Sequence, residues 1–281
     1  MTPKVQIQIV TWNSRPHLER LFLGIERQAD VDYNVEVIDN ASTDGTVEWM
    51  EQNYNVVSSP TRNPLHNDIK QNKGPLPGVE ATRNVVLIEN QTNRGFAVGH
   101  NQAFVVCQAA YVLVLNPDTE LQAGYLAEVI RVLESDGRIA SVQGKLYRQL
   151  PEGEKYGIID SCGLEMKPWG QVMDIGQNRP DKGNFEAQKG VFGATGACAL
   201  YRLEALKQVA DKHGIFDERF GSYKEDVDLA WRLQRAGWKA VFTPKATAWH
   251  GRGVGRGDTR SWRIRCLSLR NHVLMFLKNV F

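Results

Sequence analysis

Short apolar segments alternate with helix-like segments in the first half of the chain, and this alternation restricts the possible folds more than any other feature. Val5 to Val10 is rich in β-branched residues, and the apolar residues from His17 to Gln28 recur at helical spacing. A strand pattern at 35–38 and a helix pattern at 46–52 repeat this order. Because strands that alternate with helices favour a parallel sheet covered by helices, the sequence predicts an α/β fold.

The alternation continues along the chain. We expect further strands at 85–89, 111–115, 139–145, 193–202 and 246–249, and further helices at 96–110, 124–135, 203–212 and 223–236. Two segments lack such periodicity. We expect 60–83 to form an exposed excursion, to which we assign no function, and the loop-rich segment 146–189 suits contact with a substrate.

The charge balance argues against a general polyanion-binding protein. Lys and Arg number 34 and Asp and Glu number 32, giving a formal net charge of +2, so we expect no nucleic acid among the partners. The 281 residues, 42% of them hydrophobic, suffice for a large buried core. Cys107, Cys162, Cys198 and Cys266 are widely spaced and form no CxxC pair, which predicts reduced thiols in a cytoplasmic protein.

The two ends of the chain bear on its location. Met1 to Lys4 leads directly into the first strand pattern, so we expect no secretory leader. The segment from Arg263 to Phe281 mixes Arg and Lys with Leu, Val, Met and Phe at helical spacing and contains no apolar run of membrane-spanning length. This tail either lies peripherally on the inner face of the plasma membrane or docks as a helix on its own domain or on a partner subunit of a homo-oligomer.

Polar clusters follow three of the predicted strands. They are Thr11-Trp12-Asn13, Asp39-Asn40-Ala41-Ser42 and Asn116-Pro117-Asp118. In an open parallel sheet, ligands bind beyond the carboxyl ends of the strands. We therefore expect the functional site at this edge of the sheet.

Asp39 and Asp118 are the candidate ligand-binding acids of these clusters. Asp39 ends its strand where an ionised acceptor can bind a base or ribose hydroxyls, but its surroundings also suit a turn or cap. Asp118 can hold Mg²⁺ or Mn²⁺ together with phosphate oxygens and water. Taken alone, Asn-Pro-Asp is more typical of an ordinary β-turn.

Glu225, Asp226 and His250 are the candidates in the second half of the chain. The two acids open a strong helix pattern, where the helix dipole favours the ionised carboxylate that a general base for a sugar hydroxyl requires. The alternative is a pair of helix-start acids without a catalytic role. His250 precedes a stretch of Gly and Arg suited to phosphates, and imidazole is a common metal ligand, although a lone histidine is more often structural.

Six segments together resemble glycosyltransferase family 2, in particular its bacterial rhamnosyltransferase-like branch. They are IVTWNS at 9–14, VIDNASTDGT at 37–46, NRGFAVGHNQA at 93–103, VLVLNPDTEL at 112–121, GATGACALYR at 193–202 and the segment 216–250. Their order and spacing, rather than any single motif, carry the resemblance.

The resemblance implies a GT-A fold, with a Rossmann-like, mostly parallel central sheet flanked by helices, a loop-rich acceptor-side region and a C-terminal helix. It implies one glycosyltransferase domain over 1–250, divided into a nucleotide-sugar-binding half at 1–121 and an acceptor and catalytic half at 122–250. The amphipathic tail at 251–281 would follow this domain.

The resemblance also implies residue roles. The donor nucleotide would be bound by Thr11, Asn13, Asp39, Asn93, Arg94 and Asn116. Asp118 and His250 would hold a divalent metal, Mg²⁺ or Mn²⁺, while Asp226 would be the general base and Glu225 its neighbour at the acceptor site. Metal-binding relatives commonly carry an acid two positions before Asp118, so Asn116 implies a weaker grip on the metal or more reliance on His250.

The implied activity is inverting transfer of a sugar from a nucleotide diphosphate to a hydroxyl of a glycan or lipid-linked glycan, as in the synthesis of cell-envelope polysaccharides. The implied donor is deoxythymidine-diphosphate (dTDP) rhamnose, with a uridine-diphosphate (UDP) hexose as the alternative. Two other classes are a non-catalytic nucleotide-sugar-binding scaffold, which Asn116 leaves open, and a dinucleotide-dependent oxidoreductase. The absence of GxGxxG after the first strand pattern argues against the oxidoreductase.

Overall fold

The structure is a computed structural model that describes residues 3–28, 30–58, 84–149, 157–168, 170–252 and 262–280. The excursion expected at 60–83 lies outside the described residues.

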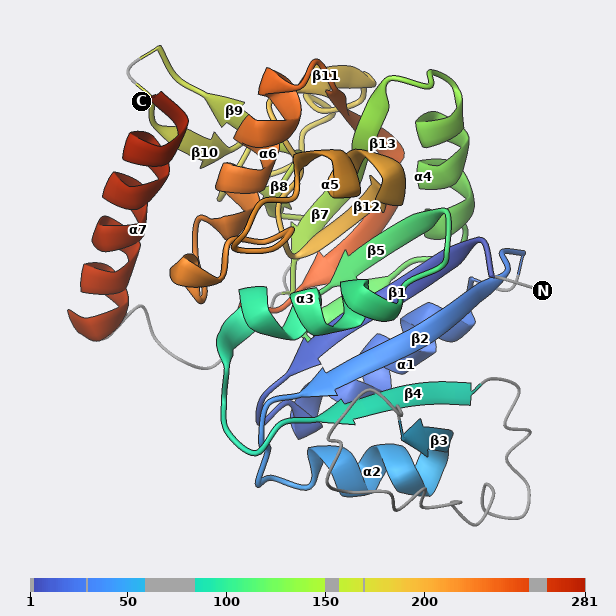
Figure 1. Ribbon diagram of the computed structural model, residues 1–281. Helices are drawn as coiled ribbons and strands as arrows, with labels where there is room; N and C mark the ends of the chain where they lie inside the picture. Colours follow the sequence, from blue (N-terminus) through green and yellow to red (C-terminus); the bar gives the residue numbers. More distant parts are fainter. Residues whose placement is uncertain are drawn as a thin grey trace.

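A mixed sheet forms the centre of the molecule (Figure 1). Its strands are, in spatial order, β11 (Lys189–Val191), β13 (Lys239–His250), β7 (Ile139–Arg148), β12 (Cys198–Arg202), β5 (Tyr111–Leu115), β1 (Val5–Thr11), β2 (Tyr33–Asp39), β4 (Asn84–Glu89) and β3 (Asn55–Ser58). The five strands from β5 to β3 run parallel, whereas β12 is antiparallel to both β5 and β7. The expected mostly parallel α/β sheet is confirmed.

Four short strands complete the pattern. β6 (Thr119–Leu121) pairs with β13 and β8 (Ile159–Ser161) pairs with β7, so both extend the central sheet. β9 (Leu164–Met166) and β10 (Val172–Asp174) form a separate hairpin. The sheet includes strands from both predicted halves of the chain, because β12 and β13 pair with β5 and β6.

Helices cover both faces of the sheet, which gives three layers. On one face, α1 (Leu18–Glu26), α2 (Thr46–Asn53) and α4 (Tyr125–Glu134) pack on alternate strand residues such as Ile7 and Leu113. On the other face, α3 (Gly95–Val106), α5 (Leu203–Val209) and α6 (Glu225–Arg235) pack on Val112 and Val114. This division follows from the period of two in a strand, which sends successive side chains to opposite faces.

Several predicted boundaries are wrong by a few residues, each for a local reason. The helix expected at 96–110 ends at Val106 because Cys107 is extended, and the helix expected at 203–212 ends at Val209 because Ala210 is extended. The helix expected from Tyr223 begins at Glu225, because Tyr223 and Lys224 have φ angles of 71° and 73°. Such left-handed backbone does not continue a right-handed helix.

The predicted strand at 246–249 and the predicted irregular segment at 146–189 need larger corrections. β13 begins already at Lys239 and includes Pro244, at the irregularity between 243 and 247 in its register with β7. The segment 146–189 contains the end of β7 and the strands β8, β9 and β10, so it is more ordered than its composition predicts.

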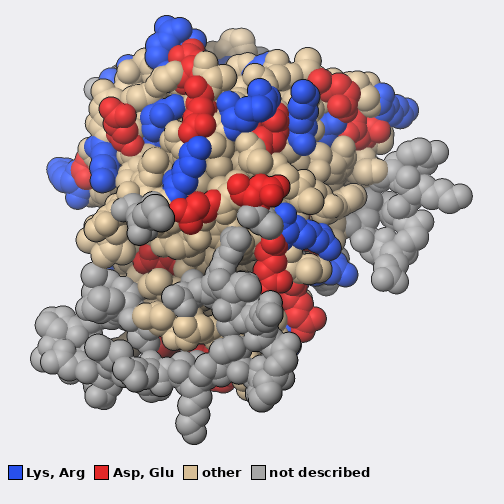
Figure 2. Space-filling model, turned by 90° about the vertical axis from the view of Figure 1, so that its right-hand side faces the viewer, with Lys and Arg blue, Asp and Glu red and all other residues tan. Residues whose placement is uncertain are grey.

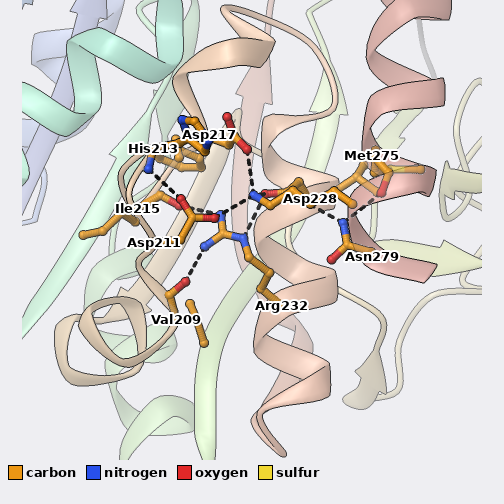
Figure 3. Close-up of polar contacts among 12 residues, drawn as sticks. Val209, Asp211, His213, Ile215, Asp217, Asp228, Arg232, Met275 and Asn279 are labelled. Carbon is orange, nitrogen blue, oxygen red and sulfur yellow. Dashed lines mark hydrogen bonds and ion pairs between the residues drawn. The ribbon is translucent and has the colours of Figure 1, made fainter. Parts of the chain in front are cut away.

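The C-terminal helix α7 (Trp262–Val280) docks on α6 of its own domain, which is one of the arrangements expected for the tail. The amine Nζ of Lys278 lies 3.1, 2.8 and 3.0 Å from carboxylate oxygens of Asp211, Asp217 and Asp228. Asn279 also donates to Asp228, at 2.9 Å. Figure 3 shows these acids converging beside α6, opposite Asn279 of α7.

Acidic and basic side chains are interspersed on the side of the molecule that Figure 2 shows. Several of them form ion pairs, such as Lys4 with Glu134 and Lys239 with Asp136. All four cysteines are free thiols, and only Cys266 is exposed. Among the described residues, no helix combines the length and the apolar character that crossing a bilayer requires.

Candidate functional site

Parallel pairing brings the polar ends of β1, β2 and β5 to one edge of the sheet. Thr11 is the register partner of Asp39, and Ile9 is the partner of Leu115, which directly precedes the Asn116 cluster. The expected meeting of the three polar clusters at this edge therefore follows from strand register.

Asp39 is buried and its carboxylate organises the loop after β2. Oδ1 accepts hydrogen bonds from Thr11 Oγ1 at 2.9 Å and Ser42 Oγ at 2.5 Å, and Oδ2 accepts from the Ser42 backbone N–H at 2.8 Å. These contacts correspond to the turn or cap role weighed for Asp39. A carboxylate offers about four acceptor positions, so one further donor can still be bound.

Asn13 joins the loop after β1 to the loop after β2. Its backbone N–H donates to Ser42 Oγ at 2.8 Å, and its side-chain Oδ1 accepts from the Thr43 N–H at 2.8 Å. The residue is exposed and has a φ of 50°, a conformation that asparagine tolerates better than most residues.

Asn40 connects these loops to the start of α3. Its side-chain Nδ2 donates to the Gly95 carbonyl at 3.2 Å, and its Oδ1 accepts from Asn90 Nδ2 at 2.9 Å and from the Arg94 backbone N–H at 3.4 Å. Asn93 accepts from the Gly95 N–H at 2.9 Å. Both Asn93 and Arg94 are exposed, beside the loop of Asp39.

Asp118 and His250 lie together although the chain separates them widely. Strand β6 pairs with β13 so that Thr119 faces His250, and the Gly251 N–H donates to the Asp118 carbonyl at 2.8 Å. The ring atom Nε2 of His250 lies 3.3 Å from Asp118 Oδ1 and 3.3 Å from Asn116 Nδ2.

Asp160 completes this group from β8. Its Oδ2 accepts from His250 Nδ1 at 2.8 Å, and its Oδ1 accepts from Arg252 Nε. Burial lowers the pKa of His250, but the hydrogen bonds and charges of Asp118 and Asp160 outweigh it and raise this pKa to about 9. The imidazole is thus oriented by Asp160, with Nε2 directed at Asp118.

Asp226 lies in the first turn of α6, half-buried, with both carboxylate oxygens bonded to backbone. Oδ2 accepts from the Gly196 N–H at 3.0 Å and Oδ1 accepts from the Val227 N–H at 2.8 Å. Glu225 is buried instead, and burial together with the charge of Asp226 raises its pKa well above the usual range. The described residues offer no hydrogen-bond partner to Glu225 Oε2, so the two neighbouring acids have different environments.

The Gly196 loop joins the Asp226 region to the Asp118 region. Gly196 binds Asp226, and the carbonyl of the next residue, Ala197, accepts from the Asn116 N–H at 2.9 Å. The start of α3 lies close to the turn before α6, since the Ala97 N–H donates to the Gly221 carbonyl at 3.0 Å. The predicted residues from β1, β2, β5, α6 and β13 thus belong to one connected set of loops.

Known proteins share this arrangement of elements. A family model described as glycosyltransferase-like family 2 matches residues 3–265. The chain belongs to this family. The family expected from the sequence is thereby confirmed, and the solved GT-A glycosyltransferases described next confirm the expected fold.

Three relatives of the glycosyltransferase show how far the similarity extends. The N-acetylglucosaminyl-diphospho-decaprenol L-rhamnosyltransferase of Mycobacterium tuberculosis is 25% identical over 92% of this chain and 79% of its own. The mannosyltransferase PcManGT of Pyrobaculum calidifontis, solved with GDP-Man and Mn²⁺, has a TM-score of 0.59 at 20% identity over 99% of this chain. GalNAc-T7, solved with UDP, GalNAc and Mn²⁺, has a TM-score of 0.66 at 12% identity over 98% of this chain.

The glycosyltransferase spans only part of the two solved relatives, 65% of the PcManGT chain and 48% of the GalNAc-T7 chain. At these identities the structural similarity establishes the fold.

The residues of the glycosyltransferase fit a divalent metal that is shared with a substrate. Among the described residues, no three His, Cys, Asp or Glu side chains are grouped as a closed metal site requires. Asp118 and His250 nevertheless face each other, and Asp160 accepts the second ring N–H of His250, as second-shell carboxylates do for metal-bound histidines. Two protein ligands suit a cation that takes its remaining ligands from phosphate and water.

The sequence did not reveal Asp160, Arg252 or the backbone of Gly196 as parts of the site. Asp160 lies in the segment that was expected to be loop-rich, and its contact with His250 spans 90 positions of the chain. A contact between residues so far apart cannot be predicted from a local sequence pattern. The Gly-Arg stretch after His250 was the one available signal for Arg252.

Proposed function

We propose that the protein is an inverting, metal-assisted glycosyltransferase that moves L-rhamnose from dTDP-rhamnose to a hydroxyl of a lipid-linked glycan. The activity of the mycobacterial relative, which its name gives as L-rhamnosyl transfer to a diphospho-decaprenol-linked sugar, supports rhamnose as the sugar and a lipid-linked glycan as the acceptor. Because such an acceptor is anchored in a membrane, we also propose that the protein acts at the inner face of the plasma membrane.

The connection from Asp226 through the Gly196 loop to Asn116 carries the proposal. It joins the proposed general base to the loop that carries Asp118, across from His250. A base and a diphosphate-binding group at one sheet edge are what a single displacement requires, because the attacking hydroxyl and the departing phosphate lie on opposite sides of the anomeric carbon.

In the proposed reaction, the acceptor oxygen attacks the anomeric carbon while the bond from that carbon to the diphosphate oxygen breaks. Asp226 takes the hydroxyl proton. The amides of Gly196 and Val227 hold its carboxylate in place, and the N-terminus of α6 favours the negative charge. A divalent metal bound by Asp118 and His250 would neutralise the charge that develops on the leaving diphosphate.

Residues of the first half would bind the nucleotide. We propose that Asp39, with its remaining acceptor position, binds the base or ribose, and that Thr11, Asn13, Asn93, Arg94 and Asn116 surround the nucleoside diphosphate. Glu225 would act beside Asp226 as a neutral carboxyl group, since burial favours its protonated form.

A panel of nucleotide sugars tests this function. With Mn²⁺ present, dTDP-rhamnose should raise the melting temperature more than UDP-hexoses do, because a ligand at 100 times its dissociation constant stabilises the folded state by about 2.7 kcal/mol. Transfer of radiolabelled rhamnose to a diphospho-polyprenyl N-acetylglucosamine acceptor should follow. Stronger stabilisation by a UDP-hexose would favour the alternative donor, and binding without transfer or hydrolysis would favour a non-catalytic scaffold.

A further inference from the structure

The outer side of α7 carries a stripe of exposed apolar side chains. Six of the twelve exposed large hydrophobic side chains among the described residues lie on this one helix: Trp262, Leu269, Val273, Phe276, Leu277 and Val280. Their steps of seven, four, three, one and three residues keep them on one side of a helix with 3.6 residues per turn. Trp262 is 78% exposed and Leu269 is 66% exposed.

The opposite side of α7 holds the helix on the domain, through an apolar cluster that includes Met275 and through polar contacts. Asn271, Met275 and Asn279 are buried there, and Lys278 bonds to three carboxylates. Figure 1 shows α7 at the periphery of the molecule. At the edge of the stripe, Phe276 also packs edge-on against Trp231 of α6, with ring centroids 6.3 Å apart. The other five stripe residues point away from the domain, which is unusual for the apolar side chains of a surface helix.

The charge of the helix identifies the surface that the stripe fits. The segment from Trp262 to Val280 contains no Asp or Glu. Besides Lys278, whose charge is taken up by three carboxylates of the domain, it carries Arg263, Arg265 and Arg270. A second copy of the same helix would place like charges against one another, which disfavours a symmetric pair. An anionic lipid surface complements both properties, since interfacial helices combine basic residues with aromatic and aliphatic side chains that enter the acyl boundary.

We propose that the outer stripe of α7 docks the protein on an anionic lipid bilayer, with the helix lying in the plane of the membrane interface. The stripe extends over about 27 Å, from 18 steps of about 1.5 Å each. Docking on a membrane would bring the protein to the lipid-linked acceptor of the proposed function, and only this biological role rests on that function.

Vesicle binding without donor or metal tests the docking separately from catalysis. We expect the full chain to sediment with vesicles of phosphatidylglycerol and phosphatidylcholine in equal parts, with a partition coefficient at least about tenfold higher than for phosphatidylcholine alone. About 1 M NaCl, where the Debye length is about 3 Å, should remove most of this difference. The double variant Leu269→Gln/Leu277→Gln should lower the partition coefficient by about tenfold or more.

The matched control is Leu23→Gln/Val105→Gln, which changes two exposed apolar side chains on α1 and α3. This control should bind vesicles like the unchanged protein. Equal binding by both double variants, or no binding by the unchanged protein, would overturn the proposal. A dimer in analytical ultracentrifugation that Leu269→Gln/Leu277→Gln dissociates would also overturn it, because a second copy would then cover the stripe. Vesicle binding without sugar transfer would refute the proposed function and leave the docking surface intact.

Discussion

The side-chain nitrogen Nδ2 of Asn271 lies 2.8 Å from the carbonyl oxygen of Tyr223, which bonds α7 to the turn directly before the Asp226 helix. The same nitrogen lies 2.9 Å from the carbonyls of Phe220 and Ser222. Tyr223 belongs to the left-handed turn, a conformation that costs about 1 to 3 kcal/mol per residue unless its surroundings hold it. Asn271 is fully buried, and its hydrogen bonds help to stabilise this turn.

Asn271→Ala should therefore disturb the placement of Asp226. We expect kcat to fall by about tenfold or more with little change in donor KM, and the free energy of unfolding to fall by about 2 kcal/mol, because buried carbonyls lose their donor. Asn279→Ala is the matched control, since it also removes a buried α7 amide but does not touch the turn. If both variants lost kcat equally, the effect would be general loosening of α7.

Asp226→Asn should lower kcat by a factor of about 10² to 10⁴ while donor affinity stays nearly unchanged, as expected when a positioned base is lost. The amide is nearly isosteric, and its carbonyl oxygen can still accept one of the backbone hydrogen bonds. Steady-state kinetics and isothermal titration with the donor measure the two effects. Normal turnover in this variant would remove Asp226 from the mechanism.

Asp160→Asn should weaken metal use through His250. Because Asp160 accepts the Nδ1–H of His250, its loss should raise the Mn²⁺ concentration for half-maximal activity by about 10- to 100-fold, the usual effect of losing a second-shell partner. Asp174→Asn is the control, since Asp174 binds Arg252 without contacting the histidine. Chelation by EDTA should abolish activity in all variants, and Mn²⁺ should restore it.

Lys278→Met should destabilise the protein by about 3 to 5 kcal/mol near neutral pH, because Asp217 and Asp228 are fully buried and lose a cation. Burial raises the pKa of Asp217, but Arg219 and Lys278 outweigh it and lower this pKa strongly. The stabilisation is therefore present above the unfolded pKa and is lost as pH falls through the folded one. Lys239→Met, at an exposed ion pair with Asp136, is the control and should change the free energy of unfolding far less in chemical denaturation.

Glu36→Gln tests a buried acid beneath α3. Burial raises the pKa of Glu36 to about 7, outweighing its hydrogen bond from Gln6. The nearby groups of α3 are His100, whose pKa burial lowers to about 3, and Cys107, whose pKa burial raises to about 11, so Glu36 alone among them titrates near neutrality.

Since the folded state holds the Glu36 proton more tightly, the contribution of Glu36 to stability is fully present below the unfolded pKa of 4.5 and is lost as pH rises through about 7. A change in pKa from 4.5 to about 7 corresponds to about 3 kcal/mol. Relative to the unchanged protein, Glu36→Gln should thus gain about this much in free energy of unfolding between pH 4.5 and 7.5. A constant difference across this range would show that Glu36 is not buried as a neutral acid.

The parallel half of the sheet could be predicted from the sequence because each strand is a short apolar run between polar turns. β1 and β5 illustrate this, since their side chains are buried on both faces of the sheet. β13 was predicted only at its end, because Pro244 and Lys245 interrupt its apolar character and strand pairing overrides local preference. The start of α6 was misplaced because the left-handed turn is held by tertiary contacts such as that of Asn271.

Candidate site residues could be predicted from the sequence where they lie at the end of a strand or helix. They could not be predicted where their role is to position another site residue through a long-range contact. Asp39, Asp118 and Asp226 each stand at a strand or helix boundary, where polar residues are conspicuous. Asp160 acts through His250 from a three-residue strand, and the buried polar side of α7 became visible only once its docking was known. Long-range partners of this kind leave no periodic trace in the sequence.

The pairing of β6 with β13 fixes the distance between the backbone at Asp118 and the backbone at His250. Thr119 and His250 are register partners, so backbone pairing brings Asp118 beside His250, while Asp160 orients the imidazole ring. Surface loops between β6 and β13 can therefore lengthen, shorten or be exchanged for those of a homologue with another acceptor without separating Asp118 from His250. A deletion of one residue inside β6, by contrast, would turn its side chains to the opposite face and separate the pair.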